Sequence, residues 1–471
     1  MPATGRGRAL ALRARPKESG RSPQPVPVPR RLPSLHESRS LRYATVFYLY
    51  LMQGLPAGFA LTAVANRLAA SGVSPPAIGG FVALVGLPWT LQFVWGPLID
   101  RYQGSPMGRR KPWVLGAQLL AFGASLGLLL VGDPARELAA LGLAFCVHSI
   151  FASVQDASVD AMAITVTPAE DRARMNAFMR GGMLTGHALG AAVLAPVMSR
   201  AGFRAAALVL SLALLALTAV TVFVRERPGD ALLPGRRRVA PADAPPGALA
   251  AVGAPPSSAS MRDILAALAR GLFAAENLRL FGAVIAVYFA ASVFIRTLST
   301  HLVQRLRWDD TELSVLTGTF GMGAAVVAIV AVGAIAGRVG ARRLLVAMML
   351  VIGAYLVTFS LLAPLWPDAR FTRAALVLWY TFDPGYSVAA MPALMAICRR
   401  GVEGSQFTAY MALVNLSDVA GGYVAGQALA VVPAPVIALA CGAVVLAAAL
   451  AVRRAPLGAP AASTPLGAQP A

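Results

Sequence analysis

Charged residues are scarce in this chain, since Asp, Glu, Lys and Arg together make up 13% of its 471 residues. A soluble domain usually carries about 25% charged residues, so the shortage argues against a water-soluble enzyme. The sequence also has only three cysteines and four histidines. Their spacing fits neither a disulfide framework nor a zinc site, so we expect no metal and no cofactor. In contrast, 57% of the residues are hydrophobic, which excludes a disordered chain.

Long apolar runs account for this composition. A helix that crosses a hydrocarbon core of about 30 Å needs roughly 20 mostly apolar residues, because it satisfies its backbone hydrogen bonds internally. By this criterion the sequence predicts an all-α polytopic membrane protein with twelve transmembrane helices. The expected spans are 43–66, 77–98, 112–131, 138–163, 174–198, 204–224, 278–302, 312–336, 342–363, 373–397, 405–427 and 433–453.

Basic residues outnumber acidic ones by 41 to 21, which gives a formal net charge of +20. Such a balance often indicates nucleic-acid binding, but binding to phosphates needs cations clustered on a water-exposed face. Here most of the cations fall in the termini and in every second loop between the predicted spans. An excess of Arg and Lys marks the cytoplasmic side of a membrane. We therefore predict that both termini are cytoplasmic and that no nucleic acid is bound.

The segments outside the spans define the predicted domains. Residues 1–42 are rich in Arg and Pro and lack an apolar core, so we expect a disordered basic cytoplasmic tail rather than a cleavable signal. Residues 225–277 read as a cytoplasmic linker of Arg, Ala, Pro and Ser. This linker separates two six-helix bundles, 43–224 and 278–454, and residues 455–471 form a second disordered tail.

A repeated loop relates the two bundles. The sequence GPLIDRYQGSPMGRRKPW starts at Gly96, between the second and third spans, and GAIAGRVGARRLL starts at Gly333, between the eighth and ninth. Both run from a Gly through a turn with Arg to a second Gly and paired Arg. This arrangement resembles the cytoplasmic signature loop of the major facilitator superfamily. The resemblance implies two six-helix halves that are related by an axis along the membrane normal.

The first copy of this loop suggests a gate between the halves. A Gly lets two helices approach closely, and an acidic side chain at a helix end can accept hydrogen bonds from a facing helix N-terminus. We expect Asp100 to make such contacts when the cavity faces outward, whereas Gly337 replaces the acidic residue in the second copy. The alternative is that the Arg residues are only positive-inside anchors. The candidate gating residues are Gly96, Asp100, Arg101, Gly108, Arg109 and Arg110.

A narrower resemblance lies in the first half. The stretch VQDASVDAMAITVTPAEDRAR from Val154 is similar to the AmpG-type muropeptide permeases, a group that also contains acetyl-CoA transporter-like proteins. Its Gln-Asp-x-x-x-Asp-Ala pattern maps onto Gln155, Asp156, Asp160 and Ala161. The resemblance implies a proton-driven importer in a bacterial cytoplasmic membrane, with a peptidoglycan fragment as cargo. Siderophore permeases resemble the same group, so a siderophore, an acyl-CoA or a sugar stays an alternative cargo.

Ionisable side chains inside the spans are candidates for the transport pathway, because a charge in the bilayer costs about 3 kcal/mol and usually faces a cavity or a partner. In the first half, Asp156 and Asp160 are four residues apart and share one helix face. Arg180 lies about two turns into the next span at similar depth, so we predict an ion pair among these residues. The sequence leaves open whether such a pair is static or moves during transport.

The second half has its own set of ionisable residues. Asp383 is our first candidate for a proton carrier, because a carboxyl group in a cavity can load and release a proton. Arg296 could compete with the proton for Asp383, or it could bind an anionic substrate. The superfamily arrangement implies that helices one, four, seven and ten line the cavity. The candidate residues of the substrate or proton pathway are Gln53, His148, Asp156, Asp160, Arg180, Arg296, Asp383 and Asp418.

Several other residues have a simpler structural interpretation. His148 and His187 could titrate or bind a polar substrate atom, but a hydrogen bond to a neighbouring helix explains them more simply. Gly182, Gly186 and Gly190 recur every four residues, which predicts close helix packing where the halves meet. Tryptophans near span ends fit interfacial anchors, and these are Trp89, Trp95, Trp113 and Trp366.

Two other classes of function stay open at the level of sequence. A polytopic enzyme that acts on lipid-linked substrates would also place Asp and His near a membrane face. The chain shows no Walker loop and no nucleophile elbow, which favours a transporter that is not an enzyme. A channel or a sensor fits the duplicated loop less well than two moving halves do. The partners that we expect are a small solute, protons and membrane lipid.

Overall fold

The computed structural model describes residues 33–168, 171–234, 275–398 and 403–454. Within these ranges the regular secondary structure is helical, apart from one isolated bridge between Ser105 and Gly108. The predicted all-α class is therefore confirmed. Most of each predicted tail and most of the predicted linker lie outside the described residues.

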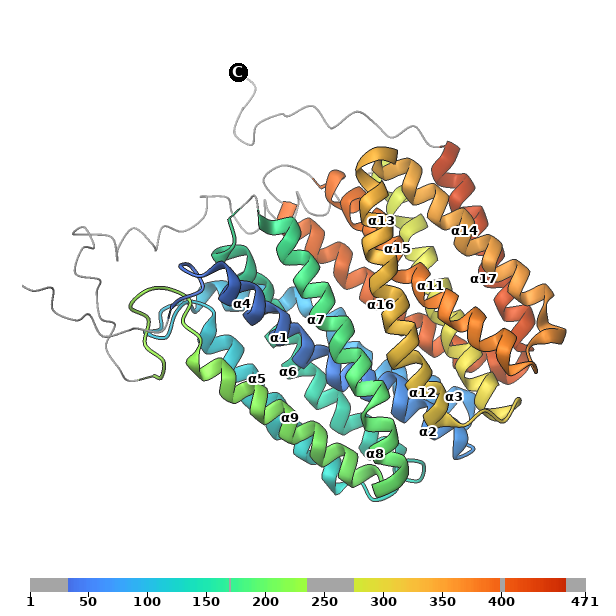
Figure 1. Cartoon of the computed structure of the whole chain (residues 1–471), viewed down its shortest axis with the longest axis horizontal. Coiled ribbons are helices and arrows are strands. Elements are labelled where there is room, and N and C mark those ends of the chain that lie inside the picture. Colours follow the sequence, from blue (N-terminus) through green and yellow to red (C-terminus); the bar gives the residue numbers. More distant parts are fainter. Residues whose placement is uncertain (1–32, 169–170, 235–274, 399–402, 455–471) are drawn as a thin grey trace, which may run out of the picture. The chain divides into compact units, whose positions relative to one another are not determined.

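Several spans of the first half are built from more than one helix (Figure 1). The uninterrupted helices are α6 (Leu138–Val166) and α9 (Phe203–Phe223). The first span joins α1 (Arg39–Gly58), a π-helical segment (Phe59–Val64) and α2 (Ala65–Ala70). The next spans contain α3 (Pro75–Thr90), a 3₁₀ turn (Gln92–Val94), α4 (Trp95–Arg101) and α5 (Lys111–Leu126). The fifth joins α7 (Arg172–Ala192) to α8 (Leu194–Ala201).

The second half repeats this up-and-down course. It begins with α11 (Ala275–Gln304) and continues through α12 (Asp310–Leu316), a π-helical segment (Thr317–Gly321) and α13 (Met322–Val339). The remaining helices are α14 (Ala341–Leu361), α15 (Ala369–Ala396), α16 (Glu403–Val431) and α17 (Ala434–Arg454).

Ten segments of the described chain are long and apolar enough to cross a membrane. The two other predicted spans correspond to α15 and α16, which are 28 and 29 residues long and so exceed the roughly 20 residues that a crossing needs. Polar residues lower their hydropathy, among them Asp383 in α15 and Asn415 and Asp418 in α16. Because these polar residues line a cavity, they are compatible with α15 and α16 crossing the membrane.

Large apolar side chains cover parts of the surface. Leu130 is 81% exposed, Val330 is 68% exposed and Val327 is 67% exposed. Many exposed side chains of this kind are unfavourable in water but suit a hydrocarbon surrounding. The surface therefore agrees with a multi-pass membrane protein.

Glycines bring α1 and α7 into backbone contact within the first half. A Cβ added at Gly186 of α7 would lie 2.1 Å from the Leu51 carbonyl oxygen of α1. A Cβ added at Gly54 of α1 would likewise lie 2.2 Å from the Met183 carbonyl oxygen of α7. The glycine row of α7 thus packs inside one half, and our prediction that it lies where the halves meet is wrong. The α1 backbone occupies the space that larger side chains at these α7 positions would need.

Several pairs of elements join the halves, and two of them pack closely through glycines. α3 packs against α16, and α7 packs against the π-helical segment Thr317–Gly321. A Cβ added at Gly79 of α3 would lie 2.9 Å from the Gly422 carbonyl oxygen of α16. A Cβ added at Gly318 would lie 2.7 Å from the Ala188 carbonyl oxygen of α7. Small residues therefore allow close contact across the interface between the halves.

Candidate functional site

A cavity of about 450 Å³ lies between the two halves. Its walls come from α1, α3, α6 and α7 of the first half and from α11, α13, α15 and α16 of the second. The four helices that the superfamily arrangement implies, α1, α6, α11 and α15, are among them. Its volume is in the range of sites that hold small solutes. Of the predicted pathway residues, the cavity is lined by Gln53, His148, Arg180, Arg296, Asp383 and Asp418.

Arg180 of α7 pairs with Asp383 of α15, with 3.6 Å between Nη2 and Oδ2. The same nitrogen donates to the Ser387 hydroxyl at 3.4 Å, and that hydroxyl is 2.9 Å from the Tyr288 hydroxyl. This pairing corrects the prediction that Arg180 bonds to an Asp of α6. The reason is the rotation of α7, which points Arg180 into the cavity toward the other half. The ion pair thus joins the two halves.

Arg296 of α11 pairs with Asp418 of α16, at 3.4 Å between Nη2 and Oδ2. It also donates to the Leu61 carbonyl oxygen of the first half at 3.3 Å. Leu61 belongs to a π-helical segment, where the usual i−4 hydrogen-bond pattern is interrupted. The structure gives Arg296 these partners and not Asp383, which differs from our prediction. α11 packs directly on α16, so Asp418 is the acid that Arg296 meets.

Asp156 and Asp160 do not line the cavity. Gln92 donates to Asp156 at 2.6 Å, and the Tyr50 hydroxyl donates to Asp160. Neither carboxylate has a salt bridge to a described residue. Both residues therefore sit behind the wall of the cavity, in contacts that link α6 to α1 and to the end of α3.

Gln53 and His148 form part of the wall of the first half. The exposed fraction is 2% for Gln53 and 4% for His148. His148 Nδ1 is 2.9 Å from the Ala121 carbonyl oxygen of α5, as the simpler interpretation of this histidine predicts.

Sequence reasoning missed several residues that line the cavity. Tyr288 and Ser292 of α11 contribute hydroxyl groups, and Trp89 of α3 lines the cavity as well. Trp366 is 2% exposed and packs against Phe359 inside the second half, so it is not an interfacial anchor. Tyrosine, serine and tryptophan are common in apolar spans, and no local pattern distinguishes those that face a cavity.

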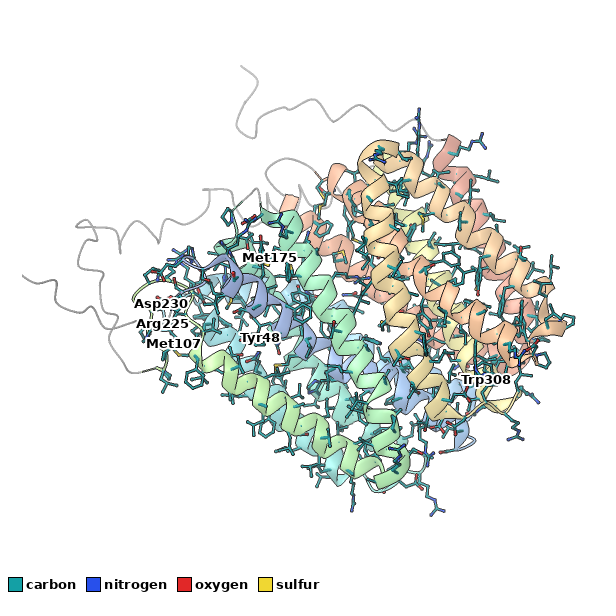
Figure 2. All side chains as sticks on the ribbon, viewed as in Figure 1. Tyr48, Met107, Met175, Arg225, Asp230 and Trp308 are labelled. Atoms are coloured by element: carbon teal, nitrogen blue, oxygen red, sulfur yellow. The ribbon has the colours of Figure 1, made fainter. Side chains whose placement is uncertain are left out.

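The loop between α4 and α5 is held by hydrogen bonds to another segment of the first half. Glu226, which follows α9, accepts hydrogen bonds from the backbone N–H groups of Arg109 at 2.9 Å, of Arg110 at 2.7 Å and of Lys111. Gly108 has a φ of +119°, and a Cβ there would lie 2.8 Å from the Glu226 carboxyl carbon. Burial raises the pKa of Glu226, while its three hydrogen bonds act in the opposite direction. Figure 2 shows this end of the molecule around Met107 and Arg225.

Three further predicted gating residues lie in α4, namely Gly96, Asp100 and Arg101. In this state, a Cβ added at Gly96 would meet no atom of the described residues within 4 Å, so the close helix contact expected at this glycine for the outward-facing state stays a prediction. Arg101 lies over the ring of its neighbour Tyr102, 5.8 Å from the ring centroid. Asp100 lies in α4, and its side chain is outside the described part of the chain.

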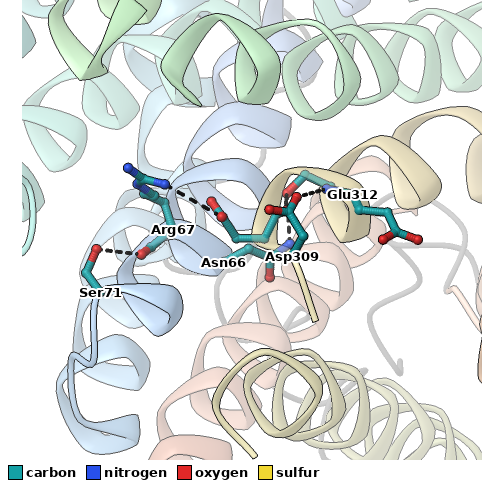
Figure 3. Close-up of polar contacts among 7 residues, drawn as sticks. Asn66, Arg67, Ser71, Asp309 and Glu312 are labelled. Atoms are coloured by element: carbon teal, nitrogen blue, oxygen red, sulfur yellow. Dashed lines mark hydrogen bonds and ion pairs between the residues drawn. The ribbon is translucent and has the colours of Figure 1, made fainter. Parts of the chain in front are cut away.

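Polar contacts join the halves at the predicted outer end of the cavity (Figure 3). Arg67 of α2 pairs with Asp310 of α12 at 3.6 Å, and the Asn66 amide donates to the Ser314 hydroxyl at 2.9 Å. Gln304 of α11 donates to the Val73 carbonyl oxygen at 2.7 Å. Each contact crosses from one half to the other, so the halves are joined at this end.

Two helical halves around a shared cavity that several charged side chains line are the architecture of a membrane solute transporter. A family model described as the Major Facilitator Superfamily matches residues 45–422, and the chain belongs to this superfamily. The chain is 26% identical to the anhydromuropeptide permease of Escherichia coli K12 over 395 residues, which cover 82% of this chain and 74% of that protein. The predicted resemblance to AmpG-type permeases is thereby confirmed.

Solved transporters share the fold at low sequence identity. The inward-open xylose transporter XylE from E. coli is 14% identical with a TM-score of 0.62, over 88% of this chain and 96% of that one. The nucleoside transporter NupG is 13% identical with a TM-score of 0.61, over 87% of this chain and 98% of that one. At these identities the likeness shows the fold alone.

Proposed function

We propose that this protein is a proton-coupled importer that works by alternating access in a bacterial cytoplasmic membrane. Both termini would lie in the cytoplasm, as the distribution of Arg predicts. The protein would move its cargo without changing it chemically, so it is not proposed to be an enzyme.

The ion pair between Arg180 and Asp383 is the observation that supports proton coupling best. It connects α7 to α15 inside the cavity, so it couples the charge state of one residue to the contact between the halves. A proton on Asp383 removes the negative charge that holds Arg180. Protonation and the ion pair therefore exclude each other. Asp383 stays our candidate for the proton carrier, and its competitor is Arg180.

Alternating access is supported by the contacts that join the halves at the predicted outer end. With both termini in the cytoplasm, Arg67 and Asp310 lie on the outer side, and the cavity would open toward the cytoplasm in this state. Outward opening would require their ion pair to break. We propose that Asp100 then forms the opposite latch, while Gly108, Arg109 and Arg110 hold Glu226 in both states.

The cargo that we propose is an anhydro-muropeptide. Similarity to the E. coli anhydromuropeptide permease supports this choice. The cavity also suits it, since Arg296 is placed to bind a carboxylate of the peptide part. Asp156 and Asp160 would act indirectly, by orienting α6 through their bonds to Gln92 and Tyr50.

Uptake of labelled anhydro-muropeptide into vesicles that contain the protein tests this proposal. We expect accumulation when a proton gradient is imposed and its collapse when a protonophore is added. Accumulation that survives the protonophore would contradict proton coupling. Absence of uptake by folded protein would contradict the cargo, and a siderophore, an acyl-CoA and a sugar would then be compared in the same vesicles.

A further inference from the structure

Arg296 of α11 divides its hydrogen bonds between the two halves. Its Nη2 is 3.4 Å from Asp418 Oδ2 of α16, which belongs to the same half. Its Nη1 donates to the Leu61 carbonyl oxygen of the first half at 3.3 Å. Both Arg296 and Leu61 line the cavity. The guanidinium is therefore part of the cavity wall and also part of the contact between the halves.

Close packing holds the side chain of Arg296 in place. A Cβ added at Gly422 of α16 would lie 3.3 Å from Arg296 Nε. The same Cβ would lie 2.8 Å from Val82 Cγ1 of α3. The arginine thus passes over a glycine where α16 faces α3, and its side chain is 18% exposed. The partners of its two outer nitrogens consequently depend on how the halves are placed.

The two contacts of Arg296 respond differently when the halves move. Asp418 moves together with Arg296, because α11 packs on α16 within one half, so this ion pair can persist. Leu61 lies in the other half, so opening at this end would take its carbonyl oxygen away from Nη1. A donor that is left without an acceptor costs free energy, and Nη1 then needs a new acceptor.

Leu61 belongs to the same span as the contacts at the predicted outer end. Asn66 and Arg67 follow it by five and six residues, which is about 8–9 Å along a helix that rises 1.5 Å per residue. Both side chains bond to α12 of the second half. An outward opening that separates these pairs would therefore also separate Arg296 from Leu61.

We infer that Arg296 Nη1 binds a carboxylate of the cargo when the outer end is open, and returns to the Leu61 carbonyl when that end closes. An anionic oxygen is a stronger acceptor for a guanidinium than a neutral carbonyl oxygen is. The carboxylate therefore stabilises the outward-open state, whereas the Leu61 carbonyl competes with it in the state described here and favours release toward the cytoplasm. This inference rests on the proposed function, because it assigns one chemical group of the cargo to one residue of the transport cavity.

Binding and distance measurements on the full-length protein in lipid nanodiscs, without a proton gradient, test this inference. The probes are the anhydro-muropeptide and its methyl ester, in which the carboxylates are neutral. The variant is Arg296→Gln, which removes the charge. Arg204→Gln is the matched control, since Arg204 also donates to a backbone carbonyl oxygen, that of Val131, but within the first half and outside the cavity lining. Spin labels at Ser71→Cys and Arg305→Cys, in a background without native cysteines, report the distance across the predicted outer end.

We expect the wild-type protein to bind the carboxylate form roughly ten- to a hundredfold more tightly than the ester, as a hydrogen bond between two charged groups implies. Arg296→Gln should bind both forms alike, while Arg204→Gln should keep the wild-type preference. In the absence of cargo, Arg296→Gln should lengthen or broaden the distance between the labels, because it no longer holds the Leu61 carbonyl. The carboxylate form should have the same effect on the wild-type protein.

Equal binding of the two forms by the wild-type protein, a comparison that needs no variant, would overturn the inference. A preference for the carboxylate form that survives in Arg296→Gln would overturn it as well. Neither readout depends on accumulation. If the preference depends on Arg296 in a protein that accumulates no cargo along a proton gradient, the inference is supported and the proposed proton coupling fails.

Discussion

Asp383 and Arg180 form an ion pair inside the cavity, with 3.6 Å between Arg180 Nη2 and Asp383 Oδ2. The two residues belong to opposite halves of the molecule. Each side chain is nearly half exposed, at 45% for Asp383 and 44% for Arg180, so both can also reach a proton or a cargo group. An ion pair this exposed is worth little for stability. The ion pair matters for transport in our proposal, because a proton and Arg180 compete for the same carboxylate of Asp383.

Asp383→Asn should abolish accumulation driven by a proton gradient, because the amide can neither carry a proton nor pair with Arg180. Exchange of cargo across the membrane should remain, since the substitution keeps the size of the side chain. Uptake and exchange in the same vesicles measure both quantities. Asp133→Asn, in an exposed loop, serves as the control and should behave as the wild type. Normal accumulation by Asp383→Asn would contradict a role of Asp383 in proton coupling.

Sequence alone predicted which charged residues lie in the cavity better than which of them pair. Asp383, Asp418, Arg180 and Arg296 stood out because they interrupt apolar spans. Their partners depend on the rotation of each helix about its axis and on which helices are neighbours, neither of which a single apolar span encodes. Arg180 therefore pairs with an acid that is 203 positions away rather than with one on the preceding helix.

At the scale of helices, the backbones of α1 and α7 pack in direct contact within the first half. Gly186→Ala should destabilise the fold by about 1–3 kcal/mol or more, because its Cβ would overlap the Leu51 carbonyl oxygen. Thermal unfolding in detergent measures the loss. Gly323→Ala in α13 is the matched control, since a Cβ there meets no atom of the described residues within 4 Å. Equal thermal stability of the two variants would contradict the packing described here.

Glu226 anchors the N-terminus of α5 to the end of α9. Glu226→Ala should lower the unfolding temperature, because it leaves three backbone N–H groups without their carboxylate partner. Glu226→Gln keeps one acceptor oxygen and should fall between the alanine variant and the wild type. Unchanged stability of Glu226→Ala would show that the loop holds its shape without this contact.

The paired Arg motif was predictable as a loop between two spans, whereas its binding partner was not. Gly108 carries a positive φ that favours glycine, and this agrees with its place in the motif. Glu226 lies 118 positions further on in a segment that the sequence marks only as the start of a linker. Elements joined by long-range contacts of this kind leave no periodic signal.

For the whole molecule, contacts at the outer end decide which side of the cavity is closed. Asp310→Ala should weaken that closure, because it removes the ion pair with Arg67 across the halves. Spin labels at Ser71→Cys and Arg305→Cys, in a background without native cysteines, would then report a longer or broader distance. Asp309→Ala is the control, since Asp309 accepts from Glu312 within its own half (Figure 3). Equal spin-label distances in the two variants would contradict a role of this ion pair in closing the outer end.

The central claim is that the two halves expose one cavity to each side of the membrane in turn. Distances between spin labels measure this directly in the full-length protein in nanodiscs, with one label pair at Ser71 and Arg305 and a second pair at Tyr102 and Arg338. We predict that cargo and a change of pH lengthen the first distance while they shorten the second. Two distances that never change, or that change in the same direction, would contradict alternating access.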